Sequence, residues 1–580
     1  MCYNNGVVVC CSGGPLMAYF LKVSKQQSRT YLSIYESFYS PDVKGTRQKS
    51  YRTIGNLDKL IESGIQDPIS YFQKEVDELN EKRRQEKQNN KINQKLISDV
   101  SPEKYLGYFP LANILNTLDV EEHFHNMQSC RNFKFDLYDV VSSLIYARAV
   151  SPLSKHKTFI DVLPSLYKKV DCSYDQLLSA VEFIGSEYEK FIEIFTVATK
   201  ENYGIDTSSS YFDCTNFYFE IDRETDFKRK GPSKENRKDP IVGMGLLLDA
   251  NMLPIGMRMY PGNESEKPVL RNIISSLKER NNISGRTIQI ADKGLNCAQN
   301  IIEAVNNNDG YIFSKSIKQL NEKEKKWALL DEGFIDVKDK NGTLVYKYKY
   351  CIDDFKYEYK DESGKKITKT IKEKRVVTYN PKLAKKKNYE IDKMVEKARI
   401  LSGYAAKKNE YGESSKYVNF ISVNGDKVKT AINHEAIEKD RMCAGYNMLV
   451  TSECMMKSKS IYETYHNLWR IEESFRVMKT ELDARPVYLQ KEASIKGHFL
   501  ICYITVLLTR ILQFKVLNNE YSTSTICNFF RSFKVVSINN NRYINMTRSS
   551  EFITALAIKL HHPITNYYLT DKQIKMMHTR

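Results

Sequence analysis

The fold is decided by SSYFDCTNFYFEI (residues 209–221) and by three later stretches, PIVGMGLLLDANMLPIGMRMYPGN (240–263), TIQIAD (287–292) and GYIFS (310–314). All four are apolar and rich in aromatic or β-branched residues, and turn-forming residues lie between them. These properties are typical of β-strands. The second stretch is long enough for two strands joined by a turn, and a helix is expected around residues 296–307. Together they predict three antiparallel strands, followed by a strand, a helix and a strand.

This succession is the strand order of an RNase H-like core. Residues 316–440 then break the pattern with a Lys-rich stretch whose alternation predicts β-hairpins, and with a helix around 386–404. AGYNMLVTS (444–452) returns to a buried strand. We therefore expect an α/β fold in which residues 204–315 and 441–515 form an RNase H-like catalytic core. The charged, β-rich segment 316–440 interrupts that core and is predicted to be an insertion domain.

Further units are predicted on either side of this core. Residues 1–16 share little with the rest of the chain and form an N-terminal extension, whereas the alternation within 17–65 predicts a small antiparallel β unit. Residues 66–108 are highly charged at helical spacing and predict a helix or linker, for which a solvated arm is favoured over a DNA-reading helix. Apolar residues at helical spacing predict a helical domain over 109–203, which is a candidate for DNA binding. Residues 516–580 are expected to be packed C-terminal helices.

The composition narrows the class of protein. Lys and Arg number 88 against 71 Asp and Glu, which leaves a net charge of +17. This balance favours an anionic partner such as nucleic acid, although a basic protein from an AT-rich genome would share it. The scattered cysteines and histidines have no zinc-ligand spacing, which favours reduced thiols in a cytoplasmic, nucleoid-associated protein. The longest apolar run, Phe499–Leu508, is too short for a membrane span and predicts a core helix.

Two aspartates lie in predicted strands, where their carboxylates could bind a metal ion. Asp213 lies inside a strand-like stretch, where an unpaired carboxylate would be costly. Asp292 closes TIQIAD at the C-terminal end of its strand. Either residue alone could be a hydrogen-bonded core residue or a turn cap, but together on neighbouring strands they favour a metal site. Asp206 precedes the strand, and Asp249 is expected to be solvated in a hairpin turn.

A third acid is selected by helix geometry. In TYHNLWRIEESFRVMKTEL (464–482) one face is apolar, with Leu468, Ile471, Phe475, Met478 and Leu482. Another face carries Tyr465, Trp469, Glu472, Arg476 and Lys479, because positions seven apart nearly eclipse. Glu472 lies in the middle of that second face, whereas Glu473 and Glu481 project elsewhere. The alternative is an ordinary i,i+4 ion pair between Glu472 and Arg476, worth about 0.3–0.5 kcal/mol.

These residues resemble the bacterial insertion-sequence transposases of the DDE superfamily, whose third-acid helix carries a Tyr-x2-Arg-x3-Glu-x6-Lys signature. Here Tyr465, Leu468, Glu472 and Lys479 stand at the four positions, so that Leu replaces the Arg. One subgroup is similar also in the stretches YFDCTNFYFE, YPGNESEK, ADKGLN, RPVY and IKGHF, and in TYLSIYES and RTIGNLDKL of the opening β unit. The resemblance extends from Met17 to about Leu512.

The resemblance implies that Asp213, Asp292 and Glu472 form a triad that binds two Mg²⁺ (or Mn²⁺) ions. It also implies that Tyr465 and Lys479 contact phosphates at the transposon end; the alternative is that they are ordinary helix-surface residues.

The replacement of Arg by Leu468 puts one DNA contact in doubt. Arg470 or Arg476 could supply the missing charge. Trp469 could stack on an unpaired base, although a buried wedge between helix and sheet is an equal alternative.

The function implied by the resemblance is cut-and-paste DNA transposition. Such an enzyme binds double-stranded DNA at terminal inverted repeats, cleaves it with divalent ions and joins the 3′-OH ends to target DNA. Family analogy implies a homodimer on DNA. Two alternatives remain open: a metal-dependent DNA nuclease of the same fold, and a catalytically inactive DNA-binding protein descended from a transposase.

Overall fold

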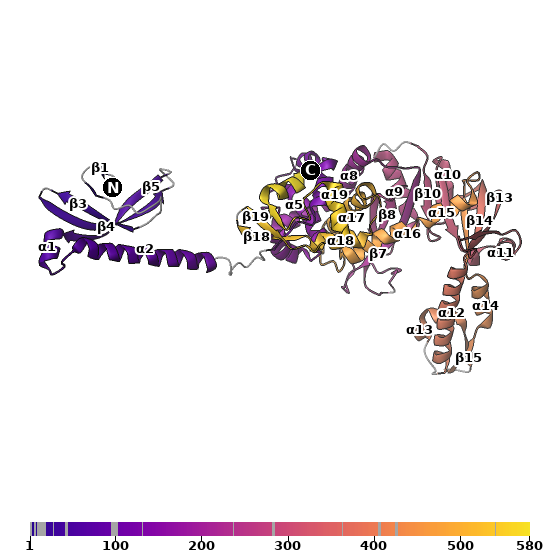
Figure 1. Ribbon diagram of the computed structural model, residues 1–580. Coiled ribbons are helices and arrows are strands. Elements are labelled where there is room, and N and C mark those ends of the chain that lie inside the picture. Colours follow the sequence, from indigo (N-terminus) through magenta and orange to yellow (C-terminus); the bar gives the residue numbers. More distant parts are fainter. Residues whose placement is uncertain are drawn as a thin grey trace. The chain divides into compact units, whose positions relative to one another are not determined.

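Figure 1 shows the computed structural model of the chain. The structure describes residues 3–4, 7–8, 19–26, 28–40, 45–93, 103–129, 131–235, 237–280, 285–361, 363–403, 408–423, 427–539 and 541–579. The chain divides into two compact units, Met1–Ser101 and Pro102–Arg580.

The N-terminal unit is an antiparallel sheet with one long helix packed on it. Its elements are β1 (Tyr3–Asn4), β2 (Val7–Val8), β3 (Tyr19–Gln26), β4 (Arg29–Ser40), β5 (Gly45–Asn56), α1 (Leu57–Glu62) and α2 (Pro68–Asn93). The strands follow one another in the order β1-β2-β3-β4-β5. Apart from β1 and β2, the predicted extension 1–16 lies outside the described residues, as does Met17.

Helix α2 is more than the solvated arm that its charge predicts. Its side chains Phe72 and Val76 are buried against Leu21, Leu32 and Ile34 of the sheet, and these five residues form the core of the unit. The many charged residues of the helix hide this apolar stripe from a reading of composition alone.

The larger unit contains a nine-stranded sheet in the order β12-β13-β14-β17-β11-β10-β7-β8-β9. The strands with the predicted core order are β7 (Ser209–Tyr218), β8 (Ile241–Leu248), β9 (Pro254–Pro261), β10 (Ile288–Ala291) and β11 (Gly310–Lys315). β7, β8 and β9 pair antiparallel in succession, and β10 lies parallel to both β7 and β11. This order and these directions are consistent with the RNase H-like core that the sequence predicts.

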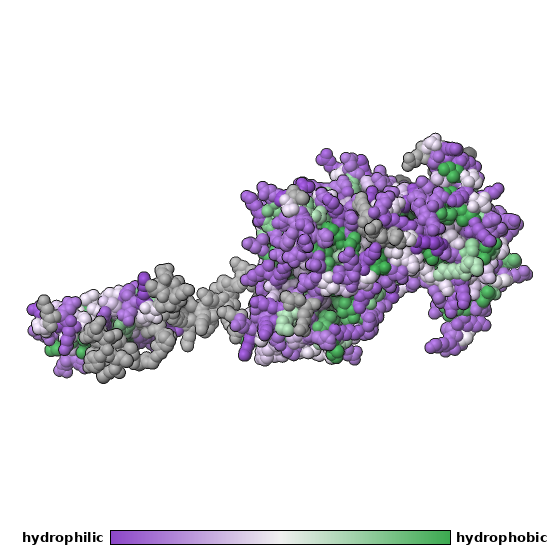
Figure 2. Space-filling model, turned by 90° about the horizontal axis from the view of Figure 1, so that it is seen from above, coloured by the Kyte–Doolittle hydropathy of each residue, from purple (hydrophilic) through white to green (hydrophobic). Residues whose placement is uncertain are grey.

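Helices cover both faces of this sheet. In the larger unit, the helices that precede or follow the 316–440 segment, up to residue 511, are α3 (Phe109–Leu118), α4 (Glu121–Ser129), α5 (Leu137–Val150), α6 (Lys155–Lys157), α7 (Tyr174–Ser186), α8 (Tyr188–Tyr203), α9 (Glu266–Arg280), α10 (Ala298–Asn306), α15 (Ser458–His466), α16 (Trp469–Arg476) and α17 (Glu492–Ile511). Leu270 of α9 and Ile301 of α10 belong to one core cluster, whereas Ile471 of α16 and Phe499 of α17 belong to the other. Polar residues dominate the surface of this unit on the face shown in Figure 2.

The segment between β11 and β17 (Tyr446–Thr451) extends the large sheet and also forms a small core of its own. Its elements are α11 (Glu322–Leu329), β12 (Ile335–Lys338), β13 (Leu344–Lys360), β14 (Lys366–Tyr379), α12 (Pro381–Ser402), α13 (Lys408–Tyr411), β15 (Val418–Val423), β16 (Lys427–Ile432) and α14 (His434–Met442). The long hairpin β13–β14 joins the large sheet, because β14 pairs with β17. β12 extends the same sheet by pairing with β13, and Ala328 of α11 packs in the core of that sheet. The elements from α12 to α14 form a two-stranded sheet and helices around a small core of their own that includes Ile391, Tyr417 and Ile437.

The C-terminal segment contains strands that the sequence pattern does not predict. Its elements are α18 (Thr523–Ser532), β18 (Lys534–Asn539), β19 (Arg542–Asn545), α19 (Glu551–Leu560), β20 (Tyr568–Thr570) and α20 (Asp571–Thr579). A four-stranded sheet forms in the order β20-β19-β18-β6, where β6 (Glu103–Tyr105) comes from the other end of the unit. Such short strands show little alternation of apolar and polar residues, and β18 pairs with β6, which is distant in sequence.

Short irregular helical turns complete the described chain: η2 (Thr158–Val162), η3 (Leu163–Ser165), η4 (Ile317–Gln319), η5 (Gly412–Tyr417), η6 (Val477–Glu481) and η7 (Leu512–Val516). The stretch Glu492–Val516 is long and apolar enough to cross a membrane, yet 83% of its most apolar window is buried inside the fold. This burial agrees with the core helix that the sequence predicts.

Helices α7 and α17 cross so closely that each needs a glycine. A Cβ at Gly497 would overlap the carbonyl oxygen of Val181, and a Cβ at Gly185 would overlap that of Ala493. Gly497 belongs to the IKGHF stretch of the sequence, so the contact gives that glycine a physical reason.

We predict that Gly497→Ala forces the two helices apart and destabilises the larger unit by about 1–3 kcal/mol, as overpacking of a core usually does. The change is measured as a lower thermal unfolding midpoint. Gly403→Ala is the matched control, because a Cβ there meets only the Ile400 carbonyl, at 3.3 Å. Equal effects of the two substitutions would contradict the close crossing.

Candidate active site

The pairing of two parallel strands places Asp213 beside Asp292. The register of β7 and β10 sets Phe212 opposite Ala291, so the next residue after each of these is one of the two aspartates. Asp213 lies within β7, and Asp292 follows the last residue of β10. The two carboxyl groups predicted from distant stretches of sequence therefore meet at one place on the sheet.

Asp213 is held in a largely buried position. Its side chain is 21% exposed, and Oδ1 accepts a hydrogen bond of 2.7 Å from the backbone N–H of Cys214. Burial is the main cause that raises the pKa of Asp213 to about 6; the carboxylates of Glu266 and Asp292 add to it, while Lys234 and the backbone N–H of Cys214 oppose it. Concentrated negative charge of this kind attracts a cation.

Asp292 is oriented by two hydroxyl groups. Ser314 of β11 donates to its Oδ1 at 2.9 Å, and Tyr465 of α15 donates to the same oxygen at 3.2 Å. Burial raises the pKa of Tyr465, and the neighbouring charges of Asp292 and Asp213 raise it as well. The phenol therefore stays protonated at neutral pH and acts as a hydrogen-bond donor to Asp292.

Lys234 and Glu266 also belong to this site, and the sequence pattern assigns neither of them a role. Lys234 Nζ lies 3.8 Å from Asp213 Oδ1 and 3.6 Å from Glu266 Oε1, and it donates to the carbonyl oxygen of Cys214. Burial lowers the pKa of Lys234, but Asp213 and Glu266 outweigh burial and leave the pKa above its usual value. A surface hollow of about 450 Å³ lies beside them and is also lined by Gly294.

Sequence signals for these two residues are weak. Glu266 lies in the YPGNESEK stretch, which contributes to the family resemblance but gives neither of its two glutamates a role. Lys234 lies in the loop between β7 and β8, and nothing in the loop's spacing relates it to Asp213.

The single helix predicted over 464–482 is interrupted at Asn467–Leu468, so Tyr465 lies on α15 and Glu472 on α16. Within α16 the buried and exposed faces are as predicted. Leu468, at 8% exposure, is buried with the apolar stripe, which explains why it can replace the signature Arg. Glu472 and Arg476 are exposed, and Trp469 is 46% exposed, so Trp469 is not the buried wedge that was the alternative. Lys479 is partly buried and lies 3.3 Å from Glu235.

The ordinary ion pair between Glu472 and Arg476 is not present. Within the described residues Glu472 has no hydrogen-bond or ion-pair partner, whereas Arg476 lies 3.9 Å from Glu473. The exposed carboxylate of Glu472 is therefore free to take part in another interaction.

Glu473 has a structural role instead. It lies 3.4 Å from Arg470 and 3.2 Å from Arg510, whose side chain is only 1% exposed. Arg510 in turn donates to Gln513 and Thr523, so the network connects α16, α17 and α18. Arg470 and Arg476, the candidates for the missing signature charge, are both paired with Glu473.

The structure thus brings Asp213 and Asp292 together but does not complete the triad. In the part of the chain that the structure describes, no three acidic, His or Cys side chains lie close enough to hold a metal ion between them. The paired carboxylates are nevertheless the hard oxygen ligands that Mg²⁺ prefers, and their mutual repulsion would be relieved by a cation.

Asp249 differs from its expected setting. It is 0% exposed, not solvated, and accepts hydrogen bonds from the backbone N–H groups of Leu253 at 2.8 Å and of Asp206 at 3.0 Å. Its carboxylate closes the β8–β9 turn and ties it to the start of β7, which is a structural role.

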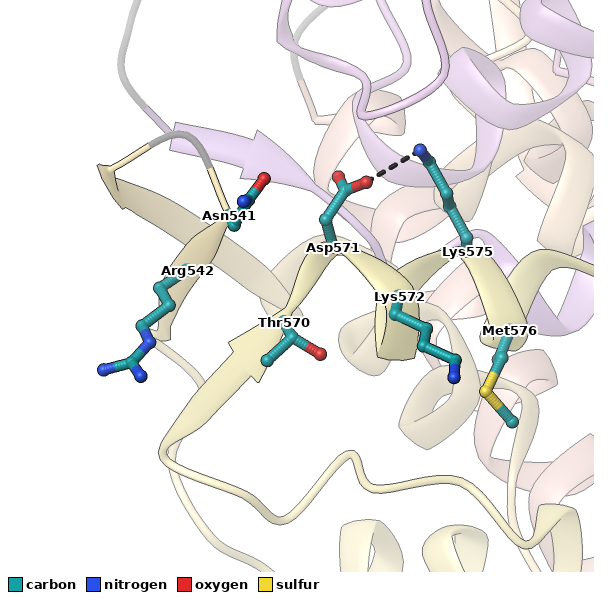
Figure 3. Close-up of a pocket in the computed structure, with 7 residues that line it drawn as sticks. All are labelled: Asn541, Arg542, Thr570, Asp571, Lys572, Lys575 and Met576. Carbon is teal, nitrogen blue, oxygen red and sulfur yellow. Dashed lines mark ion pairs between the residues drawn. The ribbon is translucent and has the colours of Figure 1, made fainter.

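A second hollow, of about 620 Å³, lies at the C-terminal sheet (Figure 3). Arg542, Lys572 and Lys575 line it with a single acid, Asp571. Asp571 is already bound by Lys575, at 2.7 Å, and by the hydroxyl of Tyr167. This hollow lacks the paired acids of the Asp213 site, which remains the better candidate for catalysis.

Comparison with known proteins adds three findings. A family model described as "Transposase DDE domain" matches residues 214–508, about half of the chain. No curated protein matches the sequence. Among solved structures, the chain is similar to the piggyBac transposase in a synaptic complex with hairpin DNA, with 9% identity, a TM-score of 0.36, and coverage of 73% of this chain and 77% of that one.

The raised pKa of Asp213 predicts a dependence of stability on pH. A carboxyl group whose pKa is about 6 when folded, against an ordinary 3.8, binds more protons when folded than when unfolded. Without divalent metal, the protein should therefore lose about 1–2 kcal/mol of stability as pH rises through this window. Asp213→Asn removes the titrating group, so its stability relative to wild type should increase between about pH 4.5 and pH 7.

Chemical unfolding of both proteins at the two pH values, in the presence of a chelator, measures this difference. Parallel changes in wild type and variant would show that the surroundings of Asp213 do not disfavour its charge.

Proposed function

The chain belongs to the family of DDE transposases, enzymes that cleave and transfer DNA strands, and on that premise we propose that it catalyses transposition of a bacterial insertion sequence. Its DNA partners in this proposal are the terminal inverted repeats of the element and a target duplex. The observation that carries the proposal is that the strands set Asp213 beside Asp292, and that Glu472, on a neighbouring helix, has no partner among the described residues.

In the proposed site, the carboxylates of Asp213, Asp292 and Glu472 hold two Mg²⁺ (or Mn²⁺) ions. Bound there, the ions would supply activation of the attacking oxygen and stabilisation of the leaving one. The strands position the two aspartates before any ion binds. Glu472 completes the set from α16, and its carboxylate has no internal partner to give up among the described residues.

Other residues act on these carboxylates and on DNA. Tyr465 holds Asp292 through the hydrogen bond from its hydroxyl, so we propose a positioning role for it in addition to the phosphate contact implied by the family resemblance. Trp469 and Arg476 are exposed on the helix that carries Glu472 and are available to contact DNA. Lys479 needs to leave Glu235 before it can reach a phosphate.

The composition fits a DNA substrate. With a net charge of +17, binding to DNA should release counterions and weaken steeply as salt increases. We propose that two copies act together on two DNA ends, in the cytoplasm where the nucleoid lies, because joining both ends to one target requires both ends in one complex.

We predict that Asp213→Asn and Asp292→Asn each abolish Mg²⁺-dependent cleavage and strand transfer while DNA binding persists. The amide keeps the size of the side chain but loses the negative charge that the ions need. The assay supplies duplexes made from the DNA that flanks the gene, where terminal inverted repeats are expected, together with a plasmid target, and measures the nicked and joined products. Retained cleavage in either variant would rule out the aspartate pair as the metal site.

Glu472 and its neighbour Glu473 offer a matched pair of variants. We predict that Glu472→Gln loses activity with little change in the unfolding midpoint, because the side chain is exposed and unpaired among the described residues. Glu473→Gln should instead lower the midpoint, because it leaves the buried Arg510 without its carboxylate. Breaking a fully buried ion pair lowers the free energy of unfolding by about 3–5 kcal/mol, and the loss here should be smaller because Glu473 is 11% exposed. The opposite pattern would identify Glu473 as the third acid.

A further inference from the structure

The sheet of the N-terminal unit has two unlike faces. Side chains that lie directly opposite each other on antiparallel strands share a face, so the register separates the residues. One face packs on α2 through Leu21, Leu32 and Ile34 (Figure 1). The other face, on which neither described helix of the unit packs, is called the open face here. The register assigns to it Phe20, Lys22 and Ser24 of β3, Arg29, Tyr31, Ser33 and Tyr35 of β4, and Ser50 and Thr53 of β5.

Contacts between side chains support this assignment. The rings of Phe20 and Tyr35 lie 6.0 Å apart, and Lys22 Nζ lies 4.5 Å from the centre of the Tyr35 ring. These residues belong to two adjacent strands and meet on the side away from the core. The open face is therefore a patch of aromatic rings, hydroxyl groups and cations.

The two faces differ in whether acids oppose their cations. The register places Lys25, Arg47, Lys49 and Arg52 on the α2 side, where Arg52 pairs with Glu75 of α2 at 2.7 Å. Strands β3, β4 and β5 carry one acid, Glu36. It projects to the α2 side, where it pairs with Lys49 at 3.2 Å and with Arg83 of α2 at 3.0 Å. The open face has Lys22 and Arg29 and, on these strands, no acid to oppose them.

This chemistry fits a DNA duplex. Cations match the phosphates, Arg side chains can donate to base edges, and Ser and Thr hydroxyls can donate to or accept from them. Strands of an antiparallel sheet can contact bases in a groove of the duplex, as β-sheet readers do. The hydrophobic core beneath, shared with α2, would hold the strands rigid while the open face contacts bases.

We propose that the open face of β3–β5 is the surface that reads the sequence of the transposon end. The proposal rests on the proposed function, since it assigns the recognition step of that transposase to a named surface. Catalysis would then be carried out by the larger unit, and selection of the DNA end by the smaller one.

The test uses the full chain and a pool of duplexes that contain a random stretch of about 20 base pairs, close to two turns of the major groove. Wild-type protein should enrich one sequence motif from the pool. Lys22→Ala/Arg29→Ala should enrich no motif, and its binding to the wild-type motif should have a log–log salt slope smaller by about 2, because two phosphate contacts are lost. Both substituted residues lie outside the core of the unit, and circular dichroism verifies that the variant folds.

Lys59→Ala/Lys74→Ala is the control. It removes the same charge from exposed positions on α1 and α2, and should leave both motif and salt slope unchanged.

Two outcomes would overturn the proposal in distinguishable ways. If wild type and the Lys22/Arg29 variant enrich the same motif with the same salt slope, the open face does not read DNA and the transposase function stands. If wild type binds no duplex at all, the proposed function fails, and the assignment of the open face fails with it.

Discussion

The parallel pairing of β7 with β10 is the constraint on which the site depends. It sets Phe212 opposite Ala291 and thereby brings Asp213 and Asp292 together from stretches separated by a meander and a helix. Parallel pairing requires a crossover, and here the crossover contains β8, β9 and α9. β11 then lies parallel on the far side of β10 and supplies Ser314, while α15 supplies Tyr465, so both hydroxyl groups reach the same oxygen of Asp292.

The cost of this arrangement is an accumulation of negative charge in a largely buried place. Burial and neighbouring acids raise the pKa of Asp213 to about 6, and Lys234 opposes them from a distance of 3.8 Å. A site that only stabilised the fold would hold its acids in close ion pairs, as Glu473 is held by Arg510. The disfavoured charge at Asp213 and the carboxylate of Glu472, which has no partner among the described residues, instead fit groups kept for binding metal ions.

Features with local signals could be predicted from the sequence. The strand order followed from four apolar stretches, and the apolar stripe of α16 followed from helical spacing that the structure buries at Ile471 and Phe475. Helix α12, Pro381–Ser402, was expected within a few residues of its bounds. Features that depend on distant contacts were missed: Lys234 joins Asp213 only through the fold, and β18 becomes a strand only by pairing with β6.

The metal site is tested most directly by locating the ion. Crystals of the full chain soaked in Mn²⁺ give an anomalous difference map in which each bound ion appears as a peak. We expect a peak contacted by the carboxylates of both Asp213 and Asp292, and its loss in crystals of Asp213→Asn. Peaks that lie only away from these two side chains, or a peak that persists in the variant, would show that the aspartate pair does not bind the metal.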